Sequence, residues 1–306
     1  MHDSSNIVAG VISSRALRPR TALVLSASAN FVGPYLFGVA VAKTVGEGLL
    51  ETSAIDLNVV YAALSSAILW NLITWYFGLP SSSSHALIGG LLGGAVLADG
   101  FQVVHMAGLI KIILALLISP LLGMIVGFFF IRLILWLFRR ATPKVNIIFR
   151  RMQVLTLLGL GLSHGTNDAQ KTMGVITLGL VSMGELSTFH VPIWVITVSA
   201  AAIALGTAIG GWRLIRTLGG KIFRIRPVHA FSSQVAGSAV ILSAAIFGGP
   251  VSTTQVMSSA IVGVGAGQRM NMVRWQVLGE MVIAWLFTIP FTVGLSALLF
   301  LAFEAF

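Results

Sequence analysis

The chain has 306 residues, of which 57% are hydrophobic and 9% charged, and its formal net charge is +10. A soluble domain carries about 25% charged residues, so this composition excludes an ordinary soluble protein and predicts a polytopic helical membrane protein. The basic residues fall in loops, where they indicate membrane topology rather than binding of nucleic acid.

Nine apolar runs, mostly of membrane-spanning length, follow one another along the chain. They are expected at residues 21–42, 57–77, 81–98, 106–138, 153–182, 191–212, 229–247, 251–266 and 275–303. The run 106–138 contains Pro120, so it is expected to form either one kinked helix or two elements.

Basic residues gather in four loops, at 15–20, 139–151, 213–226 and 269–274. Because cytoplasmic loops are rich in Lys and Arg, we expect these loops on the cytoplasmic side of the plasma (inner) membrane. On this topology residues 57–98 leave and return on the outer side, as a hairpin or a pair of crossings, and residues 229–266 leave and return on the inner side. The second half of the chain then repeats the first half upside down.

Two pairs of motifs support an internal duplication. The sequence Gly-Leu-Pro-Ser-Ser-Ser-Ser-His begins at Gly78, and Gly-Gly-Pro-Val-Ser-Thr-Thr-Gln begins 170 positions later at Gly248. The acidic motifs around Asp3 and Asp168 are 165 positions apart. We divide the chain into a first inverted repeat at 1–140, a basic cytoplasmic linker at 141–152 and a second inverted repeat at 153–306. Inverted repeats with broken helices and helical hairpins are typical of secondary transporters.

The first repeat begins abruptly. On the expected topology Met1 lies half-way through the first broken helix, where a free amino terminus is costly. We therefore expect an outer half-helix upstream of Met1. The alternative is that residues 1–14 lie at a surface and that the first ion site is degenerate.

Each hairpin turn contains a proline followed by hydroxyl side chains. These are Ser81, Ser82, Ser83 and Ser84 after Pro80, and Ser252, Thr253 and Thr254 after Pro250. Proline fits the first turn of a helix, and the unpaired N–H groups of that turn attract anions. Two such helix starts meeting from opposite sides would bind a small oxyanion. The alternative is that the hydroxyls only cap and pack the helices.

The segment 163–174 places polar side chains inside an apolar run. A charge at the bilayer centre costs about 2.5–3.5 kcal/mol on insertion scales, so it persists mainly where it has a function. The expected ion-binding residues are Asp3, Asn6, Asp168 and Gln170, with a sodium site at Asp3, Asn6, Asn167 and Asp168. Lys171 occupies the place of Asn6 and is expected to pair with Asp168, to contact the anion, or both. His85 and His164 are expected to be structural.

At these residues the chain resembles the PiT family of inorganic phosphate transporters. The similar stretches are 71–90, 164–174, 204–213 and 250–254. The resemblance implies a Na⁺- or H⁺-coupled phosphate importer with two inverted repeats. It also implies that the Asp3/Asn6 and Asn167/Asp168 motifs serve ion and phosphate, and that the Ser/Thr turns, with Lys171, serve phosphate. Gln234 and Gln255 stand where the family commonly has Glu and His, which places the chain in a Gln-bearing branch.

We therefore expect a secondary transporter, not an enzyme, that imports inorganic phosphate with Na⁺ or H⁺ by alternating access. Its partners would be phosphate, the coupling ion and the lipid bilayer, without another cofactor and without nucleic acid; a homodimer stays open. A permease for sulfate or another oxyanion is the alternative. A hydrolase using Ser83 or Ser84, His85 and an Asp is disfavoured, because the Ser and His are adjacent at one helix start.

Overall fold

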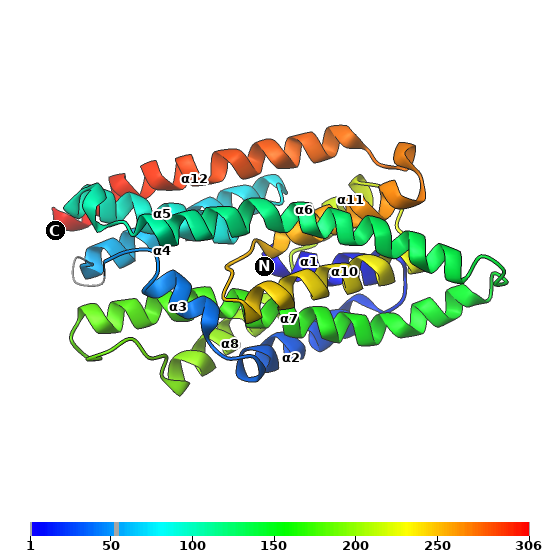
Figure 1. The fold of residues 1–306 in the computed structure, drawn as a ribbon, viewed down its shortest axis with the longest axis horizontal. Coiled ribbons are helices and arrows are strands. Elements are labelled where there is room, and N and C mark those ends of the chain that lie inside the picture. Colours follow the sequence, from blue (N-terminus) through cyan, green and yellow to red (C-terminus); the bar gives the residue numbers. More distant parts are fainter. Residues whose placement is uncertain (1, 52–54, 306) are drawn as a thin grey trace.

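The computed structural model describes residues 2–51 and 55–305, which form an elongated helical bundle (Figure 1). The α-helices are α1 His2–Ser13, α2 Pro19–Leu36, α3 Ala40–Gly46, α4 Leu57–Phe77, α5 Ser83–Asp99, α6 Met106–Leu137, α7 Val145–Ser182, α8 Ile193–Ile209, α9 Trp212–Arg216, α10 Pro227–Ile246, α11 Thr253–Gln268 and α12 Trp275–Glu304. Short 3-10 or π segments are η2 Phe101–Val103, η3 Thr217–Lys221 and η4 Met270–Met272. Within the described residues the β-structure is a single isolated bridge, between Leu50 and Val104. The predicted all-α fold is confirmed.

Five helices, α4, α6, α7, α10 and α12, are long and apolar enough to cross a membrane, and the number rises to seven if two bent helix pairs each count as one span. Large apolar side chains on α6 and α12 are exposed, among them Leu117, Leu121, Leu286 and Phe287. Exposed apolar side chains on helices whose backbone is internally hydrogen-bonded are what contact with lipid requires. The prediction of a multi-pass membrane protein is confirmed.

Two of the predicted spans are broken rather than continuous. The run 21–42 forms α2 and α3, which meet at a bend of 79°, and the run 191–212 forms α8 and the start of α9, with a bend of 63° after α8. Gly38 and Gly210 lie at these breaks with φ of +76° and +79°. Glycine adopts this left-handed conformation without strain, and it ends a helix. Hydropathy alone missed both bends because the apolar run continues through them.

Other helix boundaries also differ from the expectation. Residues 106–137 form one helix that accommodates Pro120, which decides between the two alternatives for this segment. α7 begins at Val145, so most of the segment expected as a linker is the first part of a 38-residue helix. Met1 lies outside the described residues, and α1 begins near the middle of the molecule (Figure 1).

The two hairpins enter the bundle from opposite ends. α4 and α5 come from the end that carries the C-terminus, and α10 and α11 come from the other end (Figure 1). α5 packs against α12, and α11 packs against α6. A Cβ added to Gly93 would lie 2.2 Å from the carbonyl oxygen of Val293, and one added to Gly263 would lie 2.1 Å from that of Met124. Both pairs of helices therefore touch through their backbones, which only glycine permits.

Candidate functional site

The turns of the two hairpins bring helix N-termini to the middle of the molecule. α5 and α11 each begin three residues after the proline of their turn. The prolines were expected in the first helical turn, but both precede it. Ser82 and Ser252 are the N-caps instead, and their hydroxyl oxygens accept the backbone N–H of His85 (3.1 Å) and of Gln255 (3.3 Å). These two serines therefore cap their helices, and the prediction that they also bind the substrate stays a prediction.

Residues that the sequence pairs across the repeat also touch in space. Nε2 of Gln255 lies 3.3 Å from Nδ1 of His85, although the two residues are 170 positions apart. The indole N–H of Trp285 donates to the carbonyl of Pro80 at 2.9 Å and fixes the first turn against α12. This role of Trp285 could not be predicted from the sequence, because nothing local to α12 points to a turn 205 residues away.

Asp168, near the middle of α7, is the centre of a buried polar cluster. Its Oδ1 accepts a hydrogen bond from the Lys171 ammonium, and its Oδ2 accepts one from the hydroxyl of Thr253 at 2.7 Å. Nε2 of His164 lies 3.0 Å from the same Oδ2. Asp168 is 9% exposed and Lys171 5% exposed, so the expected ion pair between them forms away from water.

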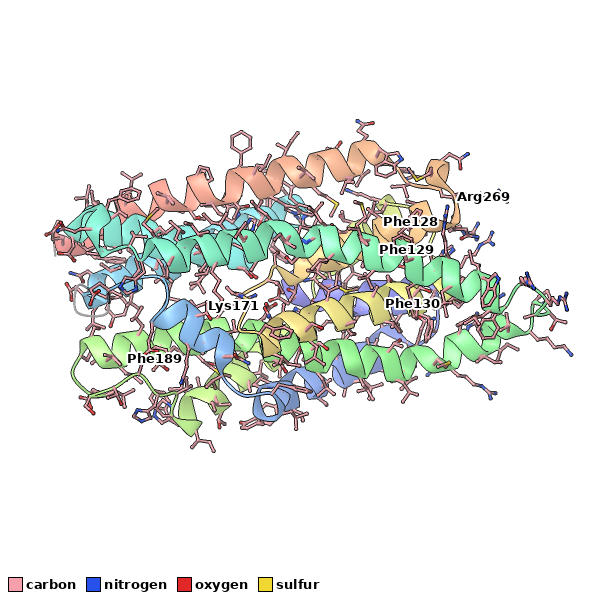
Figure 2. The ribbon with its side chains drawn as sticks, in the orientation of Figure 1. Phe128, Phe129, Phe130, Lys171, Phe189 and Arg269 are labelled. Carbon is pink, nitrogen blue, oxygen red and sulfur yellow. The ribbon has the colours of Figure 1, made fainter. Side chains whose placement is uncertain are left out.

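Lys171 joins this cluster to both hairpins and lies near the middle of the bundle (Figure 2). Its Nζ donates to the hydroxyl of Ser84 and to the carbonyl of Val251, both at 2.6 Å. The Ser84 hydroxyl donates in turn to the Val251 carbonyl at 3.1 Å. One ammonium thus connects α7 with the first turn of α5 and with the turn before α11.

Beside this cluster, two asparagines have a buried amide oxygen without a hydrogen-bond donor among the described residues. Nδ2 of Asn6 donates to the hydroxyl of Thr254 at 2.9 Å, and Nδ2 of Asn167 donates to the carbonyl of Gly249 at 3.1 Å. The Oδ1 atoms of both asparagines remain buried without a partner. Leaving a buried acceptor unsatisfied costs about 1–3 kcal/mol, so these oxygens are suited to a bound cation.

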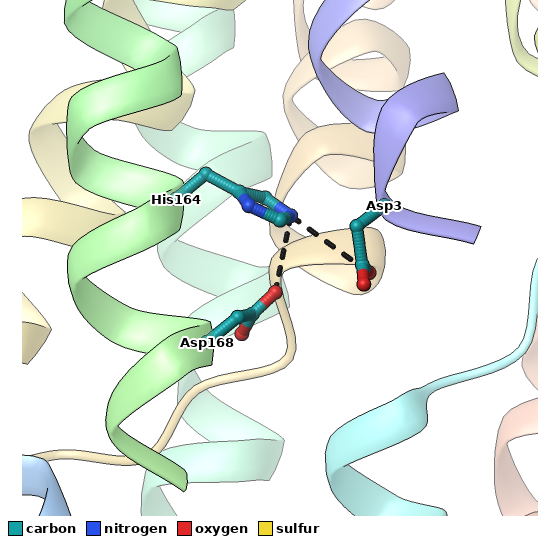
Figure 3. Close-up of side chains that lie close together, drawn as sticks. All are labelled: Asp3, His164 and Asp168. Atoms are coloured by element: carbon teal, nitrogen blue, oxygen red, sulfur yellow. Dashed lines mark ion pairs between the residues drawn. The ribbon is translucent and has the colours of Figure 1, made fainter. Parts of the chain in front are cut away.

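His164 lies between the two acidic residues that the sequence analysis identified (Figure 3). Its Nε2 is 3.0 Å from Asp168 and 3.8 Å from Oδ1 of Asp3. The ligand atoms of these three residues lie within 4.8 Å of one another. Sequence reasoning gave His164 a structural role and missed this position. The available signal was its spacing of four residues before Asp168, which places both on one face of a helix.

Some expected site residues do not join the cluster. Oε1 of Gln170 accepts the backbone N–H of Val41 at 2.8 Å, and its Nε2 donates to the carbonyl of Gly38 at 2.7 Å. Gln170 therefore braces the bend between α2 and α3 rather than facing Asp168. The hydroxyl of Ser81 lies 2.8 Å from that of Thr74, so this serine holds the turn to the end of α4.

A cavity of roughly 360 Å³ lies beside the cluster. Asp3, Ser83, Ser84, Asp168 and Lys171 contribute to its polar wall, and α4 and α8 form much of the opposite wall. It reaches Leu64 and Ser199, each about two turns from the start of its helix. The cavity therefore extends from the middle of the molecule toward the end at which α4 and α8 begin.

The arrangement can hold an anion and a cation next to each other. The N-termini of α5 and α11 and the hydroxyls that follow their turns are donors that favour an anion, and the Lys171 ammonium adds positive charge nearby. The carboxylates of Asp3 and Asp168 and the open amide oxygens of Asn6 and Asn167 favour a hard cation, which takes oxygen ligands.

Known proteins resemble this chain in sequence, and a solved structure resembles it in fold. The phosphate transporter family (PHO4) matches residues 1–144 and 138–296. A protein of Rhizobium meliloti (strain 1021) described as a probable low-affinity inorganic phosphate transporter is 43% identical over 99% of this chain and 91% of its own length. A protein of Bacillus subtilis (strain 168) with the same description is 44% identical over 97% of this chain and 90% of its own length.

A solved structure described as the sodium-dependent phosphate transporter has a TM-score of 0.89 and 24% identity, and the match covers 99% of this chain and 94% of that chain. These likenesses confirm the resemblance to the PiT transporters. They also confirm that the chain is not an enzyme, since both the family and these relatives are transporters, and the hydrolase alternative is thereby set aside. The chain belongs to the phosphate transporter family.

Proposed function

We propose that this protein imports inorganic phosphate across the plasma (inner) membrane together with Na⁺ or H⁺ by alternating access. The observation that carries the proposal is the buried cluster of Asp168, Lys171 and Ser84, held where two hairpin turns meet beside a cavity. Charged groups at this depth are expensive unless a translocated solute uses them. Close relatives described as phosphate transporters and a similar fold described as sodium-dependent support the same reading.

Phosphate would bind at the first turns of α5 and α11. Ser83 and Ser84 line the cavity, and Thr253 and Thr254 hold corresponding positions on α11. The hydroxyls and the free N–H groups of the two helix starts replace the water that a phosphate oxygen loses. The charge of Lys171, adjacent to Ser84, offsets the cost of burying the anion.

The coupling ion would bind at the carboxylates and the unpartnered amide oxygens. Asp3, Asn6, Asn167 and Asp168 supply oxygen atoms suited to Na⁺. His164, placed between two carboxylates, is the group through which H⁺ coupling would act instead. Gln170 is assigned to the bend of α2 and α3, because both ends of its amide are already hydrogen-bonded there.

The two ends of the molecule differ in packing, which supports alternating access between inverted repeats. Toward the end at which α4 and α8 begin, a cavity lies between parts of these two helices. Toward the other end α1 packs on α10, with Nε2 of Gln234 donating to the carbonyl of Ile7 at 3.4 Å and Gly10 close to Ala230. If the basic loops are cytoplasmic, this conformation is open to the outside and closed to the inside. Exchanging the two packings would give the inward-open state.

The test is uptake of labelled phosphate into proteoliposomes with imposed Na⁺ or pH gradients. We expect uptake above that of empty liposomes, driven by one of the two gradients, and weaker competition by sulfate than by unlabelled phosphate. An absence of gradient-driven uptake from protein that is folded in the liposomes would refute the proposal, and equal competition by sulfate would favour the broader oxyanion permease.

Topology can be tested directly because the chain contains no cysteine. A single cysteine introduced as Glu185→Cys, between α7 and α8, is expected to react with a membrane-impermeant maleimide added outside intact cells. Arg140→Cys, between α6 and α7, is expected to react only after the membrane is opened. The reverse pattern would overturn the proposed orientation.

A further inference from the structure

Lys171 and Asn6 hold equivalent places in the two halves of the molecule. Each lies three residues after the acidic residue of its half, Asp168 or Asp3. Each also donates to the hydroxyl of a residue in the first helical turn of a hairpin. Nζ of Lys171 donates to Ser84 at 2.6 Å, and Nδ2 of Asn6 donates to Thr254 at 2.9 Å. The acceptors are themselves 170 positions apart, so the contacts repeat along with the sequence.

The Lys171 ammonium is surrounded by protein oxygens. An ammonium group has three N–H donors, and here they go to a carboxylate oxygen of Asp168, the hydroxyl of Ser84 and the carbonyl of Val251. No donor remains for phosphate in this arrangement. Carboxylate, hydroxyl and backbone carbonyl are also the kinds of oxygen that bind hard metal cations. The ammonium thus stands where a sodium ion with the same three ligands would fit.

In the first half the neutral amide of Asn6 stands at the position that the Lys171 ammonium holds in the second half. The Oδ1 atom of Asn6 is buried and has no hydrogen-bond donor among the described residues, and the residue is 2% exposed. Asp3 lies one helical turn away on the same face of α1. A buried acceptor oxygen next to a carboxylate is suited to a cation that enters from solution, whereas in the second half the Lys171 ammonium is a fixed cation.

We propose that Lys171 is a tethered substitute for a coupling sodium ion, so that this chain moves one Na⁺ fewer per phosphate than it would with an amide at position 171. The number of Na⁺ ions moved per phosphate rests on the proposed transport function. The assignment of Lys171 to the place of a sodium ion does not. The consequence is a weaker driving force. Each co-transported cation multiplies the attainable phosphate accumulation by the cation gradient, so a tenfold Na⁺ gradient would yield about tenfold less accumulation with Lys171 than with asparagine.

The first experiment compares the wild-type protein with Lys171→Asn, which gives the second half the amide of the first. The Na⁺-to-phosphate ratio is measured in proteoliposomes by dual-label flux. We expect the ratio to rise by one ion in Lys171→Asn. The matched control is Lys111→Asn, because Lys111 is exposed on α6 outside the cluster, and its ratio is expected to equal that of wild type. An unchanged ratio in a transporting Lys171→Asn protein would overturn the proposal.

A second experiment does not require transport. Lys171→Asn leaves the Asp168 carboxylate buried without its cation, so Na⁺ should stabilise this variant more than wild type by mass action. Thermal unfolding in detergent is followed against NaCl, with choline chloride at equal ionic strength as the reference. We expect a steeper rise of the unfolding midpoint per tenfold Na⁺ in Lys171→Asn, and loss of that extra rise in Asp168→Asn/Lys171→Asn.

Equal slopes for wild type and Lys171→Asn would overturn the tethered-cation assignment. Failure of the proposed transport function would give a different result. The wild-type protein would then move no phosphate, but the unfolding midpoints of wild type and Lys171→Asn would still respond differently to Na⁺. The reciprocal variant Asn6→Lys places an ammonium in the first half, and its unfolding midpoint is expected to respond less to Na⁺ than that of wild type.

Discussion

The ion pair of Asp168 and Lys171 gives the sharpest quantitative prediction. Asp168→Asn keeps the shape of the side chain but removes its charge, and it leaves the Lys171 ammonium buried with only neutral oxygens around it. Removing one member of a buried ion pair typically costs about 3–5 kcal/mol. That cost corresponds to a fall of roughly 10²- to 10⁴-fold in the folding equilibrium constant.

Removing both charges together should cost far less. In Asp168→Asn/Lys171→Met no uncompensated charge remains, and replacing a buried pair by neutral groups of similar volume is often neutral or stabilising. The four proteins of this double-mutant cycle are therefore expected to show a coupling free energy of about 3 kcal/mol or more. The free energy of unfolding is measured by denaturant titration in mixed micelles.

Function should not recover with stability. Asp168→Asn and the double variant are both expected to insert into the membrane and to lose gradient-driven phosphate uptake, since the carboxylate that faces the cavity is absent from both. Additive effects, with a coupling energy below about 0.5 kcal/mol, would show that the pair is not electrostatically isolated from water. Full uptake by Asp168→Asn would refute its role in ion coupling.

Three further predictions follow from single contacts. His85→Gln is expected to retain most uptake, because the equivalent position in the other half is already a glutamine that lies against it; an inactive protein would show that the imidazole itself is needed. Gly93→Ala should destabilise the protein by about 1–3 kcal/mol, because its Cβ would lie 2.2 Å from the Val293 carbonyl, whereas Gly294→Ala on an open face should be neutral or stabilising by about 0.5–1 kcal/mol; equal unfolding midpoints would contradict this. Gln170→Leu should lower the free energy of unfolding by about 1–3 kcal/mol and leave the cation concentration for half-maximal uptake unchanged. A change in that concentration would show that Gln170 takes part in ion binding.

The membrane class, most of the long helices and the identity of the central polar residues could be predicted from the amino-acid sequence. These features are local or depend on repetition: apolar runs, an acid and a base inside one of them, and two proline-hydroxyl turns 170 positions apart. Asp168 and Lys171 could be paired from their spacing alone, because residues three apart on a helix face the same way.

Which of these groups meet depends on how the helices pack, and the sequence does not show it. Whether Gln170 faces the cluster or the bend of α2 and α3 depends on a neighbour about 130 positions away. His164 joins Asp168 to Asp3 only because α1 is placed against α7. The bends at Gly38 and Gly210 depend on backbone dihedral angles that an apolar run does not encode. Spacing along the chain fixes the face of a helix, but the partner on that face is chosen by packing between segments far apart in sequence.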